Sequence, residues 1–382
     1  MTATKSWLSY IMRTTGPQQF FSYPHVDNQN FNVPKNIPLN QPLAYLHMQW
    51  SGRIVIGVAN YTSVSPESLL NVIANFKLNG THSALGNQTP FNLSGANLFK
   101  IQKLFNIRGN SIYVNGVRLS DDVLSNGIPT TTFGNVGTYD VQVNWTIPVF
   151  PLGLNDQQAI LYSYNAAAWG QTLQLTIQSG DKTSFGVPAG GTIVTFSAFG
   201  TGAGSPTINL LTTYISLGGF QNSVAQAVKV LNDISIGAVL TAAATTTRLA
   251  LLQNQKTTAI VQKTGTSQAS TVGTVYATLS DSIVEQTIVR LNNNPLRNLL
   301  LNSVSKEFYG FRMNTVQPLG YLGVFFDDGN PTPNSWTALQ GQNFPGGAQF
   351  DVAANVVGAA ATNIGDIIQE YIIGTPVVAG SK

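Results

Sequence analysis

The sequence contains no cysteine, which excludes disulfide bonds and thiolate metal sites and leaves the redox compartment undecided. Charged residues are also scarce: Asp, Glu, Lys and Arg make up 9% of the 382 residues, against about 25% in an ordinary soluble domain. No apolar run reaches the roughly 18 residues of a membrane span, and no signal-peptide core is present near the N-terminus. Membrane association would therefore be peripheral. The net charge of +3, without a dense Lys/Arg run, gives little support for nucleic-acid binding.

With so few charges, the polar surface must come from Asn, Gln, Thr and Ser. These residues favour strands and turns over long solvated helices. Uncharged polar groups also cost less to desolvate than charges, so such a surface suits burial against neighbouring copies. A secreted protein of low charge would have the same composition. We favour assembly over that alternative.

The residues that support catalysis are few. The three histidines, His25, His47 and His82, all lie in the first quarter, and no GxSxG nucleophile motif occurs. None of the four glutamates has a carboxylate partner nearby in sequence (Glu67, Glu285, Glu307 and Glu370). A β-rich glycoside hydrolase would need two carboxylates within about 5 to 10 Å across a cleft. The sequence therefore predicts no enzyme, no catalytic residue and no cofactor.

Two acidic clusters supply oxygen ligands of the kind that Ca²⁺ prefers. They are Asp121-Asp122 and the segment from Asp327 and Asp328 to Asn330. Neither has the spacing of an EF-hand loop, and Asp-Gly-Asn is commoner as ordinary turn chemistry. We therefore predict no metal site.

The most informative stretch runs from Tyr139 to Ile177 and predicts a strand, a helix and a second strand. Residues 140–147 alternate polar and apolar side chains, the pattern of a half-buried strand, which Pro148 ends. Asn155 is a suitable N-cap for a helix that continues to Ala168. Alternation then resumes over 173–177. A short helix between two strands is unusual in an otherwise all-β chain.

Residues 1–40 are predicted to form an N-terminal arm. The segment is rich in Pro, Asn and Gln and cannot build its own core, yet it carries many aromatic residues. Two interpretations stay open: the arm docks on a neighbouring subunit or on a membrane, or it packs along its own barrel. The residues predicted to make the partner or membrane contact are Trp7, Tyr10, Ile11, Phe20 and Phe21.

The rest of the chain divides into two β-rich blocks, residues 41–220 and 221–382. The first block contains strand candidates at 53–59, 99–107, 111–119, 139–147, 173–177, 192–199 and 207–217. The second begins with a helical connector at 218–232. It contains a further helix at 292–305 and strand candidates at 272–279, 283–291, 308–316, 321–326, 349–357 and 367–373. The second block repeats the first in plan, although the two do not align residue by residue.

The segment from Asp140 to Ile177 resembles the strand–helix–strand of the double jelly-roll major capsid proteins of tailless, internal-membrane-containing icosahedral phages. This is the tectivirus-like group, whose fold is shared with adenovirus hexon. The matching residues are Asp140–Pro148, Leu154–Gln158 and Leu173–Ile177. The arm, the connector and a last strand agree in order, but residue-level similarity covers about 40 positions. The block at 221–382 has no clear counterpart of the corner at Trp145–Pro148.

The resemblance implies an all-β fold of two side-by-side eight-stranded jelly rolls with short inserted helices. It implies a major capsid protein that trimerises into pseudo-hexagonal capsomers and tiles an icosahedral viral shell, made in the host cytoplasm and located in the virion. Expected partners are the other copies of a homotrimer, neighbouring capsomers, other capsid proteins and possible peripheral contact with an internal membrane, without sequence-specific nucleic acid. The family implies no catalytic residue. The alternative is a virion-surface or secreted β-sandwich protein that binds a glycan or receptor.

Overall fold

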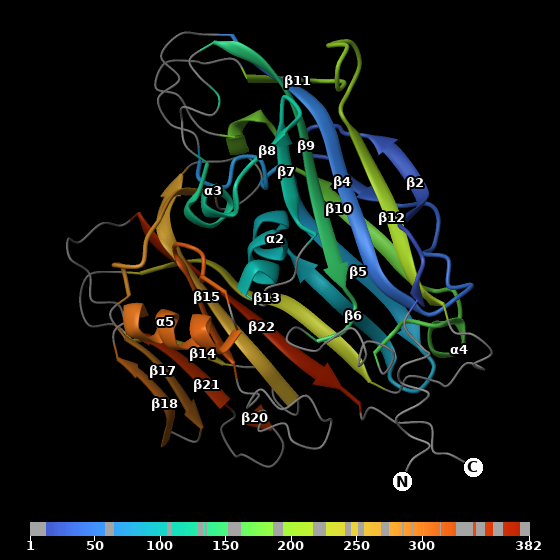
Figure 1. Ribbon diagram of the computed structural model, residues 1–382. Helices are drawn as coiled ribbons and strands as arrows, with labels where there is room; N and C mark the ends of the chain where they lie inside the picture. Colours follow the sequence, from blue (N-terminus) through green and yellow to red (C-terminus); the bar gives the residue numbers. More distant parts are fainter. Residues whose placement is uncertain are drawn as a thin grey trace.

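The protein consists mainly of strands that form two barrels side by side (Figure 1). We call the strands up to Ser216 the first barrel and those from Val228 onward the second barrel. The predicted all-β fold is confirmed. The computed structural model describes residues 13–57, 65–104, 109–128, 133, 136–151, 162–185, 194–216, 227–240, 246–250, 256–268, 275–284, 286–291, 294–300, 302–313, 315–325, 339–340, 348–353 and 362–374.

One sheet belongs to the first barrel alone. Its order is β1 (Arg13–Thr14), β12 (Thr207–Ser216), β4 (Leu43–Ile56), β9 (Gly137–Pro148), β7 (Ser111–Val114) and β8 (Val117–Arg118), with β2 (Gln18–Pro24) also on β12 and β11 (Val194–Ser197) on β4.

A second sheet runs through both barrels. Its order is β16 (Val275–Leu279), β15 (Lys256–Gln268), β22 (Asn363–Ile373), β13 (Val228–Val239), β6 (Gly86–Leu93), β5 (Ile73–His82), β10 (Gln174–Ser179) and β3 (Asn30–Asn32), and β15 also pairs with β19 (Tyr321–Phe325) and β20 (Leu339–Gln340). A third sheet completes the second barrel with β14 (Thr246–Ala250), β21 (Ala348–Ala353), β17 (Gln286–Leu291) and β18 (Asn294–Leu300).

The eight strands of each predicted jelly roll are present as two layers of four. In the first barrel the layers are β2-β12-β4-β9 and β3-β10-β5-β6; in the second they are β13-β22-β15-β19 and β14-β21-β17-β18. The remaining elements are α2 (Gly95–Leu104), α3 (Asp121–Asn126), α4 (Ala166–Trp169), α5 (Asn302–Met313) and the 3₁₀ turn η3 (Lys182–Phe185). No helix among the described residues is long and apolar enough to cross a membrane.

The alternation predicted for residues 140–147 is confirmed in β9. Every second side chain, from Val141 to Ile147, is buried, and Trp145 is fully enclosed. The Trp145 indole donates a hydrogen bond to the carbonyl oxygen of Gly95 (2.9 Å) and packs edge-on against Phe99. The helix α2 is thereby fixed against the core of the first barrel.

Two segments predicted as strands are helices. Residues 99–104 lie in α2, which begins after Ser94, whose side chain accepts a hydrogen bond from the Asn97 amide. The strand prediction was wrong because nearly every side chain of α2 is buried, so its sequence shows no polar face. Residues 308–313 lie in α5, and the helix predicted at 292–305 is wrong over 294–300, which form β18. There Pro295 lies on an edge strand, where its missing N–H is tolerated.

The helix predicted from Asn155 to Ala168 is also corrected. Residues 152–161 lie outside the described residues, and Tyr164 forms a β-bridge with Leu43 instead of a helical turn. The helix α4 begins only at Ala166, where Asn165 caps it by accepting from the Ala168 amide (2.8 Å). The connector helix predicted at 218–232 is likewise wrong over 228–232, which form β13.

The described part of the predicted arm is built into the first barrel. Strand β2 pairs antiparallel with β12, β3 pairs with β10, and Val33, Ile37 and Leu39 are buried in the core. Of the two open interpretations, packing along its own barrel therefore holds for residues 18–40. A hydrophobic core cluster extends from Trp50 and Trp145 in the first barrel to Tyr321 and Ile368 in the second.

Candidate functional site

Of the five residues predicted to contact a partner, Phe20 and Phe21 lie within the described residues, on β2. Both side chains are half-buried and pack against the core of their own barrel. The Phe21 ring lies 6.0 Å from that of Tyr23 and 6.2 Å from that of Phe31. Residues Trp7, Tyr10 and Ile11, as well as Asp327 and Asp328, lie outside the described residues.

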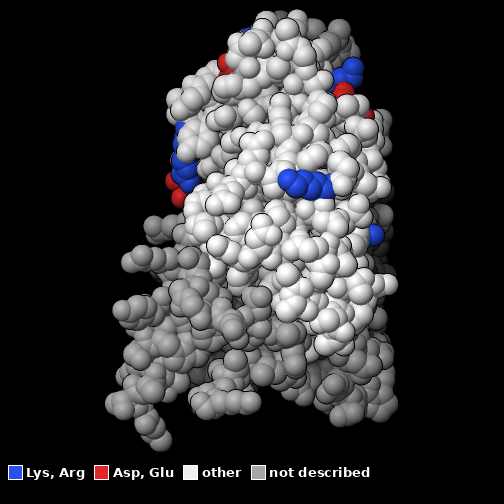
Figure 2. All heavy atoms as spheres, turned by 90° about the vertical axis from the view of Figure 1, so that its right-hand side faces the viewer, with Lys and Arg blue, Asp and Glu red and all other residues white. Residues whose placement is uncertain are grey.

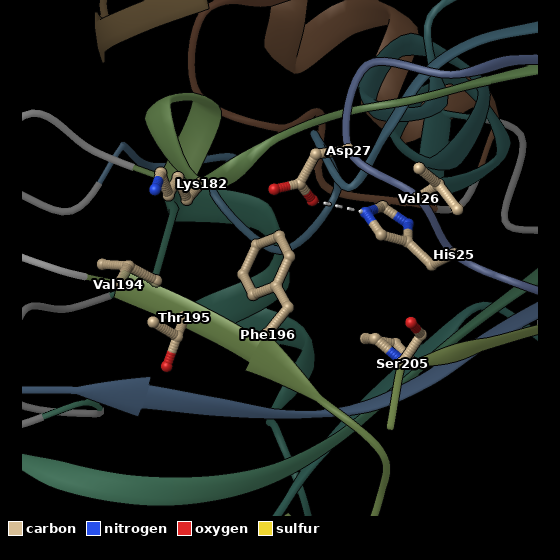
Figure 3. A pocket seen from close by; sticks show the side chains of 9 residues that line it. His25, Val26, Asp27, Lys182, Val194, Thr195, Phe196 and Ser205 are labelled. Carbon is tan, nitrogen blue, oxygen red and sulfur yellow. Dashed lines mark hydrogen bonds and ion pairs between the residues drawn. The ribbon is translucent and has the colours of Figure 1, made fainter. Parts of the chain in front are cut away.

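A hollow of about 420 Å³ lies beside β11 (Figure 3). Its floor includes His25, whose Nδ1 accepts a hydrogen bond from the Trp50 indole (3.2 Å). The other ring nitrogen lies 3.2 Å from a carboxylate oxygen of Asp27. Because both nitrogens of His25 are engaged, the ring has no free position from which to take a proton from Ser205, which also lines the hollow.

A cluster of buried polar groups lies where the two barrels meet, and we call it the junction. The first barrel supplies Glu67 and Asn97, and the second supplies Lys263 and Tyr321. The Lys263 ammonium lies 2.5 Å from Glu67 Oε2 and donates to Asn97 Oδ1 (3.2 Å). The Tyr321 hydroxyl donates to Glu67 Oε1 (2.6 Å). All four side chains are buried, so the ion pair is shielded from solvent.

Two aspartates of the second barrel complete this cluster. Asp233 on β13 accepts hydrogen bonds from the Ser94 amide (3.0 Å) and from the Asn97 side-chain amide (3.1 Å). Asp366 on β22 accepts from the Gly237 amide (2.7 Å) and lies 4.0 Å from the Lys263 ammonium. Burial, and then the neighbouring Asp366 carboxylate, raise the pKa of Asp233 to about 7.

A second buried ion pair lies further along β13. The Lys229 ammonium donates to the carbonyl oxygen of Pro148 (3.1 Å), lies 3.6 Å from Glu370 Oε2 and stands 5.3 Å from the centre of the Phe91 ring. Burial lowers the pKa of Lys229 to about 8, against the opposing effect of Glu370. Thr258 also donates to the Glu370 carboxylate (2.7 Å). The first barrel therefore contributes a carbonyl oxygen and an aromatic face to a charge of the second barrel.

Backbone pairing joins the barrels at the same place. Strands β6 and β13 run parallel, with Phe91 opposite Leu231 and Asn92 opposite Asn232. Backbone hydrogen bonds and buried charges therefore act together at the junction. Within the described residues, no group of three or more His, Cys, Asp or Glu side chains is placed to hold a metal ion. The groups of this cluster hydrogen-bond to one another across the interface between the barrels.

Sequence reasoning did not find the junction, because its partners are far apart in the chain. Glu67 and Lys263 are 196 residues apart, and Glu67 and Tyr321 are 254 apart. One signal was present in the sequence. In a chain with 9% charged residues, a Lys or Asp in the middle of an apolar strand is exceptional and therefore requires a partner.

No protein-family model and no curated protein sequence matches this chain. Solved structures match over nearly its full length. A chain from the atomic structure of Sulfolobus turreted icosahedral virus matches with a TM-score of 0.59 at 13% identity, covering 95% of this chain and 91% of that one. The major capsid protein P2 of bacteriophage PM2 matches with a TM-score of 0.56 at 8% identity, covering 97% and 100%. A chain of the PBCV-1 virus capsid matches with a TM-score of 0.55 at 12% identity, covering 97% of each.

These likenesses show the fold and nothing more, since all identities are low. The two-barrel arrangement is the double jelly roll expected from the resemblance of residues 140–177. The likeness extends over both barrels, including the block at 221–382 in which no corner like Trp145–Pro148 was found.

Proposed function

We propose that this double jelly-roll chain is the major capsid protein of an icosahedral virus. Three copies would form a pseudo-hexagonal capsomer, and capsomers would tile the shell of the virion. One observation carries the proposal: solved structures of a major capsid protein and of a virus capsid match both barrels and nearly the whole of each chain.

The physical properties of the chain suit assembly better than turnover. The buried carboxylates of Glu67 and Glu370 are paired with Lys263 and Lys229, and the low charge of the chain keeps the desolvation of contacting surfaces inexpensive. The one hollow described above holds a histidine with both nitrogens occupied. We infer that the protein is not an enzyme and that it requires no cofactor.

The proposed partners are two further copies of this chain, neighbouring capsomers and other capsid proteins. The protein would be made in the host cytoplasm and reside in the virion. Trp7, Tyr10 and Ile11 are proposed to contact neighbours or, peripherally, an internal membrane. Deletion of residues 1–12 should then leave capsomers intact and block shell formation. Deleting as far as residue 30 would instead remove β2 from its barrel.

The proposal is tested by the mass of the purified protein in solution. Light scattering on the eluting peak should give about 122 kDa, three times the chain mass of 40.8 kDa. A monodisperse monomer at micromolar concentration would refute the proposal. A stable dimer would also refute it, because two chains supply only four barrels.

A further inference from the structure

The two barrels repeat one pairing plan, which the sequence alone does not align. In the first barrel β4 is flanked by β12 and β9, and β12 carries β2 on its other side. In the second barrel β15 is flanked by β22 and β19, and β22 carries β13. The second layer of each barrel repeats in the same order, β3-β10-β5-β6 in the first and β14-β21-β17-β18 in the second. The corresponding elements are therefore β2 and β13, β3 and β14, β4 and β15, β5 and β17, β6 and β18, α2 and α5, β9 and β19, β10 and β21, and β12 and β22.

The register agrees with this correspondence at the β6–α2 corner. β6 ends at Leu93, which lies opposite Phe76 of β5, and α2 begins two residues later. β18 ends at Leu300, which lies opposite Gln286 of β17, and α5 also begins two residues later. Leu93 and Leu300 therefore occupy the same position. By the same count, Asn97 of α2 corresponds to Val304 of α5.

The junction uses one edge from each barrel. The outer edge of β6 pairs in parallel with the outer edge of β13. Their counterparts, β18 and β2, each have one partner strand among the described residues: β18 pairs with β17, and β2 pairs with β12. They lie at opposite ends of the molecule, β2 on the right and β18 at the lower left of Figure 1. Among the described residues, each copy therefore has the counterparts of both junction strands at opposite ends of the molecule.

The exposure of two apolar side chains on α5 is an independent observation that points to the same contact. In the junction, Asn97 of α2 is fully buried because it contacts Asp233, Lys263 and Tyr321 of the second barrel. The side chain at the corresponding position of α5, Val304, is 59% exposed. Phe308, one turn further on the same face, is 53% exposed. Exposed large apolar side chains that cluster on one face indicate an interaction site.

We propose that the outer edge of β18 in one copy pairs in parallel with β2 of the next copy, repeating the β6–β13 junction between chains. The proposal rests on the proposed trimer and names its contact. Such a contact is head-to-tail, so it generates either a closed ring or an open filament. Three copies supply six barrels and six contacts with the same strand pairing, alternately within and between chains. The partner that covers Val304 is therefore a second copy of this chain.

The properties of β2 fit this partner. The strand Gln18–Pro24 contains no charged residue, and the described part of the surrounding face carries few charges (Figure 2). The Lys35 ammonium reaches the strand from outside it and donates a hydrogen bond to the Phe20 carbonyl oxygen (3.3 Å). The half-buried Phe20 and Phe21 lie in this strand. β13 carries Lys229 and Asp233, which are both in contact with the first barrel, whereas β2 has no charged residue at any position. The contact between chains should therefore lack buried ion pairs and should dissociate more readily than the junction within the chain.

Disulfide trapping tests the pairing directly, because the chain has no cysteine of its own. Ser22→Cys on β2 is combined in turn with Arg297→Cys, Asn298→Cys or Leu299→Cys on β18. Neighbouring strands lie about 4.8 Å apart, within the reach of a disulfide. The expected product is a covalent trimer on a non-reducing gel. Asn92→Cys with Asn232→Cys, across the junction, is the positive control and should close within one chain.

A surface substitution supplies the second readout. Val304→Glu should raise the concentration at which trimers dissociate by about tenfold or more, because it buries a charge without a partner. Val117→Glu is the matched control, since Val117 is 68% exposed and lies on the β7–β8 hairpin outside the proposed contact. Below the concentration at which trimers dissociate, both variants should unfold at the same temperature as the parent protein.

The outcomes separate the inference from the proposed function. Trimers that form without any β2–β18 disulfide, and that tolerate Val304→Glu as well as Val117→Glu, would overturn the inference and leave the capsid proposal standing. A parent protein that is monomeric by light scattering would overturn both. A covalent trimer in at least one cysteine combination, with loss of trimers in Val304→Glu alone, supports the pairing.

Discussion

The buried ion pair of Lys263 and Glu67 joins the two barrels, and its removal should lower the free energy of unfolding. The Lys263 side chain is 3% exposed and that of Glu67 is 1% exposed, and their charged atoms lie 2.5 Å apart. Lys263→Met would leave the Glu67 carboxylate buried, with the Tyr321 hydroxyl as its remaining side-chain donor among the described residues. Removing one partner of such a pair costs about 3 to 5 kcal/mol of folding free energy. We expect Lys263→Met to be destabilised by that amount.

Two further variants make this prediction specific. Lys263→Met combined with Glu67→Gln removes both charges and keeps an amide for Tyr321, so it should recover most of the lost stability. Arg118→Met is the matched control for loss of a cation, because Arg118 and its partner Asp121 are 44% and 66% exposed. That exposed pair should contribute between about 0 and 1 kcal/mol.

The assay is urea unfolding at neutral pH, followed by circular dichroism and tryptophan fluorescence. A loss of less than about 1 kcal/mol in Lys263→Met would refute the reasoning, because it would mean that the junction does not depend on this pair. A double variant that is as unstable as the sum of its single changes would also refute it.

Three other changes test the junction and the packing of α2. Asp233 holds its proton up to about pH 7 in the folded chain and loses it near 3.8 when unfolded. Its contribution to the free energy of unfolding should therefore fall by about 2 to 4 kcal/mol as pH rises from about 4 to about 7. In Asp233→Asn, the free energy of unfolding measured with urea should depend less on pH over that range. Gly95→Ala should lower the unfolding temperature despite the better helix propensity of alanine, because the new Cβ would lie 2.5 Å from the Ile73 carbonyl oxygen. Gly16→Ala is the control: its Cβ would meet nothing within 4 Å, so the unfolding temperature should not change. Trp145→Phe should cost about 1 to 3 kcal/mol in urea unfolding, because it removes the indole hydrogen bond to the buried Gly95 carbonyl oxygen and reduces the volume of a fully buried side chain.

The strands that could be predicted from sequence are those with one buried and one polar face. β9 is such a strand, since its side chains alternate between core and half-exposed positions. β10 shows the same alternation between Leu175 and Ile177. In both, the period of two is visible directly in the residue types.

The elements that could not be predicted are those enclosed on all sides or placed by distant contacts. α2 is buried around its whole circumference, so residues 99–104 show no helical period. β18 contains Pro295 and two adjacent leucines, a local pattern that favours a helix, and its pairing with β17 overrides it. The junction depends on contacts such as that of Lys263 with Glu67, across 196 residues. The pattern of neighbouring residues in the sequence does not indicate such a distant partner.

Electron microscopy of the purified protein tests the central claim most directly. The account predicts single particles that average to a ring of six barrels with threefold symmetry, each chain supplying two neighbours in the ring. Particles that contain a single pair of barrels at micromolar concentration, or open filaments without closure, would contradict it.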